Sequence, residues 1–277
     1  MIRIITDSTA DLGMDLLSHY RIEMIPLYVL MGEQSFLDGV NISLEDLFRS
    51  VQETGQLPKT SAASIGDFVK KFNGSEDIVY IGISSQLSAT IKNATIAAET
   101  LGKENIYIVD SLNLSTGIGL LALRAAELRD EGMSARDIAE TIKALVPKVR
   151  TSFIIETLDY LYKGGRCTAL QNLMSSLLSI RPIIAVRPDG TLGVKAKTRG
   201  TRKKGLMELV KDFEEHLEEI DLHRVFITHT GCVADAEFLK SELMSRAKIE
   251  EILITRAGSV IASHCGPDTI GILYMVK

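Results

Sequence analysis

Tryptophan is absent from this chain of 277 residues, and cysteine, proline and aromatic residues are scarce. Aromatic residues make up 5% of the sequence and hydrophobic residues 45%, so the interior must consist mainly of aliphatic side chains. The three cysteines, Cys167, Cys232 and Cys265, are odd in number and show no CxxC spacing. This pattern argues against a disulfide framework and a thiolate zinc site, and it fits a reducing compartment.

Long apolar runs and an excess of positive charge are also missing. No stretch approaches the ~18–20 apolar residues of a membrane span, and the opening "MIRIITDST" becomes polar too early for a signal peptide. The net charge of −5 argues against a general nucleic-acid or anionic-membrane binder. We therefore expect a cytoplasmic protein with no nucleic-acid partner and no stable membrane insertion.

Short apolar runs alternate with helical patterns in the first half of the chain. The runs that predict strands are residues 3–6, 22–30, 78–83 and 106–109, and the patterns that predict helices are residues 11–20, 44–51, 88–101, 116–130 and 134–149. Such alternation favours an α/β fold with a parallel, Rossmann-like sheet.

The order becomes less regular from about Thr151. The stretch "RTSFIIET" is followed by predicted helices through Leu161 and Leu178 and then by "RPIIAV". Beyond these we expect a basic loop near Arg199, a charged helix over residues 203–219 and strands at "RVFITH", "EILIT" and "IGILYMV". The change predicts two domains, an N-terminal α/β domain at 1–150 and a C-terminal α/β domain at 151–277.

Four hydroxyl-rich stretches stand out, and they read "TDSTADL" (6–12), "KTSAAS" (59–64), "SSQLSAT" (84–90) and "DSLNLSTG" (110–117). One interpretation is helix capping, and the spacing of Ser64 and Asp67 does predict a capping box. The other is an anion site, because ligands of parallel sheets bind outside the carboxyl ends of the strands. The residues alone leave both open.

Familiar catalytic signatures are missing, since the chain has no P-loop, no GxSxG elbow and no HExxH zinc site. Gly117 and Gly119 nominally fit GxGxxA, but they lie inside an apolar helical pattern and predict a packing helix. In "GSVIASHCGPDTIGI" (258–272), His264 is the histidine best placed to be fixed beside a glycine turn. Arg166 follows two glycines, where backbone can approach a ligand closely.

A basic run, "KTRGTRKK" (197–204), places five cations within eight positions. It predicts either a solvated loop or a docking site for an acidic or phosphate-bearing partner.

Seven motifs occur in the order found in one family: "TDSTADL", "PKTSAAS", "ISSQLSAT", "VDS", "LDYLYKGGR", "RPI" and "GSVIASHCGP". From about residue 3 to residue 276 the chain therefore resembles the DegV family, the bacterial fatty-acid-binding proteins. The resemblance implies a lipid-binding carrier, not an enzyme, that holds one long-chain fatty acid in a tunnel between or within its two domains and uses no other cofactor. It also implies a separate fatty acid kinase protein, which phosphorylates the carboxyl group with ATP and yields an acyl phosphate for phospholipid synthesis.

The same resemblance implies roles for particular residues. Thr60 and Ser88 match the family's carboxyl-binding hydroxyls, with Ser61 as an adjacent alternative. His264 and Arg166 match polar residues near the same head group, so we expect His264 to close the carboxyl site. The segment containing Arg199 and Arg202 resembles the basic segment proposed to meet the kinase.

This interpretation agrees with physical chemistry, because an aliphatic tunnel suits a methylene chain and a buried carboxylate needs donors. Two alternatives stay open at this point. One is a regulatory module that senses a lipid or metabolite and signals through the basic segment. The other is an enzyme related to small-carbonyl phosphotransferases, in which His264 engages the substrate covalently. We expect Cys265 to be a packing residue rather than a nucleophile.

Overall fold

The computed structural model describes residues 1–167 and 180–277, and the helix predicted through Leu178 lies outside these residues. The first part of the chain contains β1 (Ile2–Asp7), the short 3-10 helix η1 (Ser8–Ala10), α1 (Met14–His19), β2 (Ile22–Ile25), β3 (Tyr28–Met31), β4 (Gln34–Leu37), α2 (Leu44–Thr54), β5 (Lys59–Ser61), α3 (Ile65–Lys71), β6 (Asp77–Gly82), α4 (Thr90–Leu101), β7 (Ile106–Asp110), α5 (Thr116–Asp130), α6 (Ala135–Leu145) and the 3-10 helix η2 (Val146–Lys148). The second part contains β8 (Val149–Ile154), α7 (Asp159–Lys163), β9 (Ile180–Val186), β10 (Leu192–Arg199), α8 (Arg202–Glu215), β11 (Ile220–His229), α9 (Val233–Arg246), β12 (Glu251–Arg256), α10 (Ser259–Cys265) and β13 (Ile270–Val276).

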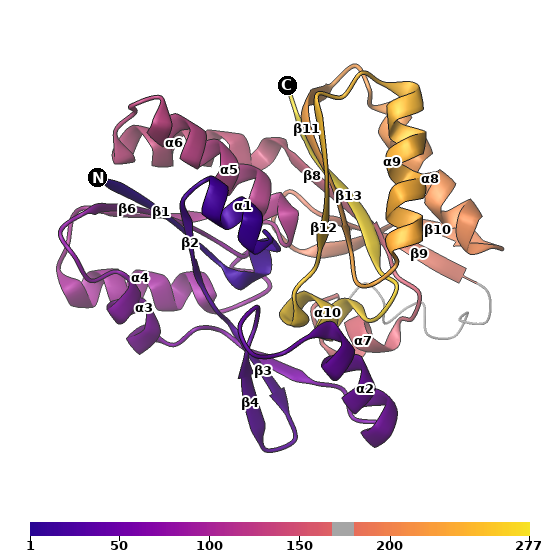
Figure 1. Ribbon diagram of the computed structural model, residues 1–277, viewed down its shortest axis with the longest axis horizontal. Helices are drawn as coiled ribbons and strands as arrows, with labels where there is room; N and C mark the ends of the chain where they lie inside the picture. The colour runs from indigo at the N-terminus through magenta and orange to yellow at the C-terminus, as the bar shows by residue number, and fades with distance from the viewer. Residues whose placement is uncertain (168–179) are drawn as a thin grey trace.

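The predicted parallel sheet is present and has the strand order β2-β1-β6-β7. Successive residues of a strand face opposite sides of a sheet, and here both sides are buried. Ile4 belongs to the core shared with α5 and α6, whereas its neighbour Ile5 belongs to the core shared with α3 and α4. The two helix pairs therefore cover opposite faces of this sheet (Figure 1).

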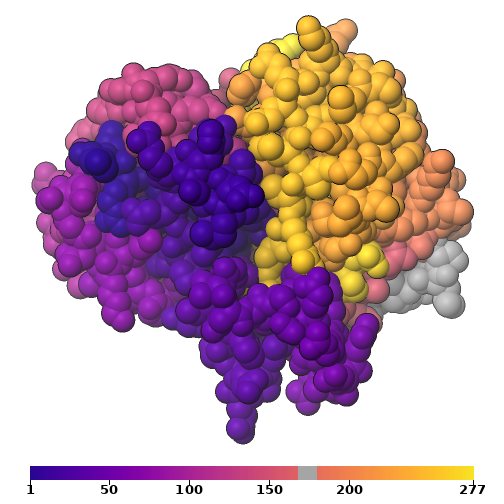
Figure 2. Space-filling view, in the orientation of Figure 1, coloured from indigo at the N-terminus to yellow at the C-terminus, as the bar shows by residue number. Residues whose placement is uncertain are grey.

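The expected strand over residues 22–30 is wrong as a single element. It is interrupted at Pro26, whose missing amide hydrogen cannot join a sheet ladder. β2 before the proline pairs with β1, whereas β3 after it turns into a three-stranded antiparallel sheet of order β4-β3-β5. We call this second unit the small sheet. The space-filling view shows the chain around it projecting below the two larger masses of the molecule (Figure 2).

A six-stranded sheet of order β10-β9-β8-β13-β11-β12 dominates the second half. α8 and α9 cover one of its faces, and their apolar residues share a core with the sheet. α5 packs on β8, β11 and β13 as well as on β1 and β6, so it lies between the two larger sheets. Gly117 and Gly119 are buried within it, which confirms the packing interpretation of the GxGxxA match.

The six-stranded sheet begins at Val149, close to the predicted boundary, while the division into domains at residue 150 stays a prediction. The basic loop expected near Arg199 is wrong in its structure. Arg199 is the last residue of β10, and Arg202 is already the first residue of α8. Among the described residues no helix has the length and apolar character needed to cross a membrane.

Candidate functional site

One cavity of about 310 Å³ lies where the small sheet, α7, α10 and the turn before α4 meet, and we call it the head-group cavity. Its polar lining includes all five residues that the sequence nominated for the carboxyl site, which are Thr60, Ser61, Ser88, Arg166 and His264. Most of the remaining lining is aliphatic. Residues up to 204 positions apart in the sequence are therefore brought to one hollow.

A hydrogen bond between Thr60 and His264 closes one wall of the head-group cavity. Thr60 lies on β5, and its Oγ1 is 2.7 Å from Nε2 of His264 in the last turn of α10. Burial and, to a smaller degree, the positive charge of Arg166 lower the pKa of His264 to about 4. The imidazole is therefore neutral at neutral pH, and its buried Nδ1 has no hydrogen-bond partner among the described residues.

The other end of α10 is held by two buried carboxyl groups. Asp11 Oδ1 accepts a hydrogen bond from Gly258 N at 2.7 Å, and Asp38 Oδ1 accepts one from Ser259 N at 2.6 Å. A Cβ atom on Gly258 would lie 2.8 Å from Asp38 Oδ1, so a side chain there would displace this contact. Burial raises the pKa of both carboxyl groups. α10, which carries His264, is thus positioned by residues from the first part of the chain.

Ser88 lies in the turn between β6 and α4, with its Oγ 2.7 Å from Thr90 Oγ1 and 3.3 Å from the amide of Thr90. When the Thr90 hydroxyl donates to Ser88, the Ser88 hydroxyl hydrogen is free for a ligand. Ser61 is exposed and donates only a long hydrogen bond of 3.3 Å to Ala62 O. Sequence reasoning missed Asn93, which lines the same cavity and donates to Ala63 O at 2.8 Å. The signal was its place in the first turn of the helix that follows Ser88.

Arg166 follows α7 and lies at the edge of the head-group cavity. Its NH1 donates to Gly164 O at 2.7 Å, and its Nε makes a long contact of 3.4 Å with Leu87 O. No carboxylate among the described residues pairs with it. Its guanidinium charge is therefore oriented by two carbonyl groups and uncompensated.

Two further hollows adjoin the head-group cavity. The inner pocket, about 20 Å³, shares Leu114, Ile261 and Cys265 with it and reaches β8 and β13 at Phe153 and Leu273. The outer cavity, about 590 Å³, shares Thr60, Arg166 and His264 with it and is otherwise lined by residues 55–59, α7 and Ser263. The three hollows thus follow one another from the apolar core to the surface.

The stretch "TDSTADL" does not line the head-group cavity. Asp7 accepts hydrogen bonds from Thr9 N at 3.0 Å, Tyr80 OH at 2.9 Å and Ile83 N at 2.9 Å, and its side chain is fully buried. This stretch therefore has the capping role that the sequence offered as one interpretation. The capping box of Ser64 and Asp67 is likewise present.

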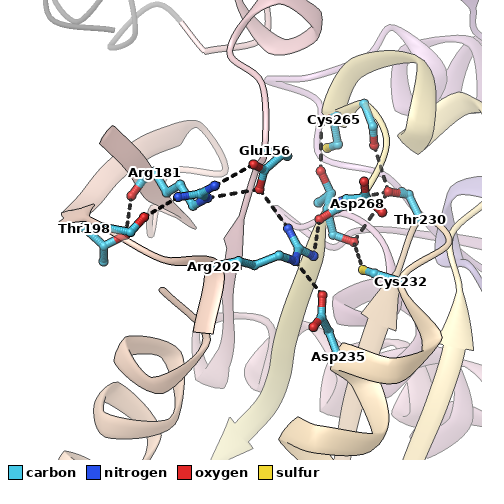
Figure 3. Close-up of polar contacts among 12 residues, drawn as sticks. Glu156, Arg181, Thr198, Arg202, Thr230, Cys232, Asp235, Cys265 and Asp268 are labelled. Atoms are coloured by element: carbon cyan, nitrogen blue, oxygen red, sulfur yellow. Dashed lines mark hydrogen bonds and ion pairs between the residues drawn. The ribbon is translucent and has the colours of Figure 1, made fainter. Parts of the chain in front are cut away.

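A network of ion pairs centred on Arg202 contacts Asp268, which directly follows the Gly266-Pro267 turn (Figure 3). Arg202 Nε contacts Asp235 Oδ2 at 2.5 Å, its NH1 contacts Glu156 Oε2 at 3.0 Å, and its NH2 donates to Asp268 O at 2.7 Å. Glu156 also binds Arg181 through both carboxylate oxygens. Each of the three side-chain nitrogen atoms of Arg202 thus has a partner within the chain.

Arg199 and Arg202, paired as docking residues in the sequence prediction, differ in their surroundings. Arg199 is exposed at the end of β10 and has no hydrogen bond or ion pair through its side chain among the described residues. The exposed fraction of the Arg202 side chain is 24%. The docking role of the pair stays a prediction, and Arg199 is the member free to serve it.

The turn itself uses unusual backbone. Gly266 has a φ of 79°, and a Cβ there would lie 2.9 Å from the ring of Tyr160. Asp268 has a φ of 55°, the left-handed conformation that aspartate tolerates better than most residues. Within residues 1–167 and 180–277, no group of three histidine, cysteine or acidic side chains is arranged to hold a metal ion.

A family model described as "Uncharacterised protein, DegV family" matches residues 1–277. The chain belongs to the DegV family. A DegV domain-containing protein of Caldanaerobacter subterraneus is 31% identical over 100% of this chain and 99% of its own length.

Solved structures agree with this assignment. The structure described as "Fatty Acid Binding of a DegV family Protein from Thermus thermophilus" is 30% identical, covers 100% of this chain and 99% of its own, and has a TM-score of 0.92. The Streptococcus pneumoniae Fatty Acid Kinase (Fak) B3 protein, loaded with linoleic acid, has a TM-score of 0.88 at 21% identity, with full coverage of both chains. At that identity the second likeness shows the shared fold.

Proposed function

We propose that this DegV-family protein binds one long-chain fatty acid, with the carboxyl group at the polar residues of the head-group cavity and the acyl chain along its aliphatic lining towards the inner pocket, which widens to admit the chain. The observation that carries the proposal is that one cavity combines a mainly aliphatic lining with six polar residues, the five nominated from the sequence and Asn93. Its volume of about 310 Å³ lies in the range of small-molecule sites. The description of the Thermus relative as fatty-acid-binding supports the same ligand class.

The hydrogen bond between Thr60 and His264 suits a carboxylate. If neutral His264 donates from Nε2 to Thr60 Oγ1, the Thr60 hydroxyl hydrogen is free to donate to a carboxylate oxygen. Ser88 supplies a second hydroxyl, and the positive charge of Arg166, which no carboxylate of the described residues pairs with, attracts the anion. Donors aimed at a partly buried carboxylate offset the cost of removing it from water.

The tail needs no polar partner. Each methylene transferred from water to an apolar site contributes about 0.8 kcal/mol, so the aliphatic walls provide most of the affinity. Leu114, Ile261 and Cys265 line both the head-group cavity and the inner pocket, so a chain that passes inward must cross between them. Replacing Leu114 by Trp is expected to block this passage and to favour shorter chains.

We propose further that the protein is a carrier that presents the carboxyl group to a kinase protein, and that the resulting acyl phosphate enters phospholipid synthesis. The outer cavity supports this, because it leads from the Thr60–His264 pair to exposed side chains at the surface. Because it is exposed and its side chain has no partner among the described residues, Arg199 is the better docking candidate of the predicted pair. Cysteine usage supports a cytoplasmic location.

The first experiment is native mass spectrometry of the purified protein, followed by solvent extraction and identification of the bound molecule. One stoichiometric fatty acid is the expected result. A protein that is empty and stays empty after incubation with palmitate or oleate would contradict the proposal.

The site is then tested by replacing single hydroxyls. Thr60→Val and Ser88→Ala are each expected to weaken fatty acid binding about tenfold, since each removes a hydrogen bond to a charged group. The matched control is Thr95→Val, because Thr95 is an exposed residue of α4 whose Oγ1 bonds Ile91 O within the helix. Equal affinities in all three variants would remove Thr60 and Ser88 from the site.

A further inference from the structure

The outer cavity carries positive charge that nothing in the described chain neutralises. Lys59, Lys163 and Arg166 line it, and its lining contains no aspartate or glutamate. Lys59 and Lys163 are exposed, and neither amine has a hydrogen bond or ion pair among the described residues. Cations that converge on a hollow without counter-charges concentrate anions there.

The outer cavity is also separated from the head-group cavity only by groups that touch both. Thr60, Arg166 and His264 line the two hollows. Gly164 allows α7 to approach the imidazole closely, because a Cβ there would lie 2.5 Å from Nδ1 of His264. A carboxylate bound at Thr60 would therefore have the apolar chain on one side and the three cations on the other.

Phosphorylation of such a carboxylate would enlarge the head group in one direction. A carboxylate oxygen would form a bond to the terminal phosphorus of ATP, the bond from that phosphorus to the bridging oxygen would break, and ADP would leave with the electron pair. The new phosphoryl group carries about −1.5 to −2 charge. The inner side of the head-group cavity offers aliphatic residues such as Leu114 and Ile261, which cannot solvate this charge.

We propose that the outer cavity is a phosphate-binding site, in which Lys59 and Lys163 together with Arg166 hold the phosphoryl group of an acyl phosphate formed on the carboxyl group. The proposal rests on the proposed function, because it needs an acyl chain in the inner pocket. The same phosphate chemistry is present in free inorganic phosphate, so the test separates the two sources.

The test compares two ligands with the same chain, palmitate and the stable monoester hexadecyl phosphate. Dissociation constants are measured for the wild-type protein, for the double variant Lys59→Met/Lys163→Met, and for the control Lys143→Met/Lys211→Met. Lys143 and Lys211 are exposed lysines of α6 and α8 that line none of the three hollows. Circular dichroism and thermal unfolding verify that both double variants are folded.

The expected result is that the Lys59/Lys163 variant weakens hexadecyl phosphate about tenfold and changes palmitate less than about twofold. The affinity for hexadecyl phosphate should also depend less on salt in this variant than in the wild-type protein. The control should leave both ligands unchanged.

Three outcomes would overturn the phosphate site. They are equal losses for the two ligands, no loss for either, and binding of inorganic phosphate alone with the same lysine dependence while hexadecyl phosphate does not bind. If the wild-type protein binds palmitate and one of these outcomes follows, the proposed function stands without the phosphate site. If the wild-type protein binds neither palmitate nor hexadecyl phosphate, the proposed function itself is contradicted.

Discussion

Two polar clusters meet the chain on either side of the Gly266-Pro267 turn, one at His264 and one at Asp268, and they are built in opposite ways. In the head-group cluster, His264 Nδ1 has no partner and Arg166 has no counter-charge among the described residues. In the ion-pair cluster, each of the three side-chain nitrogen atoms of Arg202 contacts Glu156, Asp235 or the carbonyl of Asp268. Polar groups that the chain leaves unsatisfied are available to a ligand, whereas saturated ones hold the fold together. In these two clusters, the presence or absence of partners within the chain thus distinguishes the proposed binding residues from the structural ones.

The largest effect is expected from breaking the saturated cluster. Arg202→Met should lower the free energy of unfolding by about 3 kcal/mol, because Glu156 and Asp235 lose their shared, partly buried partner. Urea unfolding measures this change, and Arg199→Met, at an exposed position without partners, should stay within about 0.5 kcal/mol. If Arg202→Met unfolds with the same free energy as the wild-type protein, the ion-pair cluster does not stabilise the fold and the contrast between the two clusters is wrong.

A smaller effect concerns pH and the unsaturated cluster. The pKa of His264 is lowered to about 4 in the folded chain, whereas an unfolded histidine titrates near 6.5. Between pH 6.5 and pH 4, His264 is therefore protonated in the unfolded state but neutral in the folded state. The free energy of unfolding decreases as pH falls through this range. At pH 5 the loss through His264 is about 2 kcal/mol.

Comparison with His264→Asn isolates this contribution from that of the carboxyl groups. The difference in unfolding free energy between pH 7 and pH 5 should be smaller in the variant by about the amount above. An unchanged slope would mean that His264 is more hydrated than its position indicates.

The next effect is a coupling between two residues of the head-group cluster. Thr60→Val, His264→Asn and the double variant form a cycle in which fatty acid binding should show a coupling of about 1 kcal/mol, because the two side chains share one hydrogen bond. Additive losses would show that the two residues contact the ligand independently.

The smallest expected difference concerns the two cysteines next to the clusters. Burial raises the pKa of Cys232 to about 11 and that of Cys265 to about 12, so both thiols are protonated at pH 8 and react slowly with disulfide reagents. Cys232 is the less buried of the two and should react first. Bound fatty acid should slow only Cys265, which lines the head-group cavity. Equal protection of both would place the ligand elsewhere.

Local sequence patterns predicted much of the fold. The helix predicted over residues 116–130 has the bounds of α5, and the three strands predicted at "RVFITH", "EILIT" and "IGILYMV" are present, because hydrophobic periodicity records which face is buried. The small sheet was missed, since its strands are only three or four residues long and half-exposed. Pro26 is a sequence signal for a break in the strand, but the apolar residues on both sides of it made residues 22–30 look like one continuous strand.

The sequence indicated which residues belong to the candidate site, but not which contacts they make. Thr60, Ser88 and His264 followed from motifs, and the structure brings them to one cavity. The saturation of Arg202 could not be read from "KTRGTRKK", because its partners Glu156 and Asp235 lie 46 and 33 residues away in the sequence. A charge is visible in a sequence, whereas its neutralisation depends on long-range folding.

Helix α10 belongs to the second half of the chain by sequence but is held by residues of the first half. Asp11 and Asp38 bind its first turn, and Thr60 touches its last turn. In a chimera that joins residues 1–150 of this chain to the second half of a relative, the relative's α10 must therefore fit Asp11, Asp38 and Thr60, which lie far from it in the sequence. Recombination between family members is therefore constrained at α10. Exchanging α10 together with its three partners should restore fatty acid binding to a chimera that has lost it.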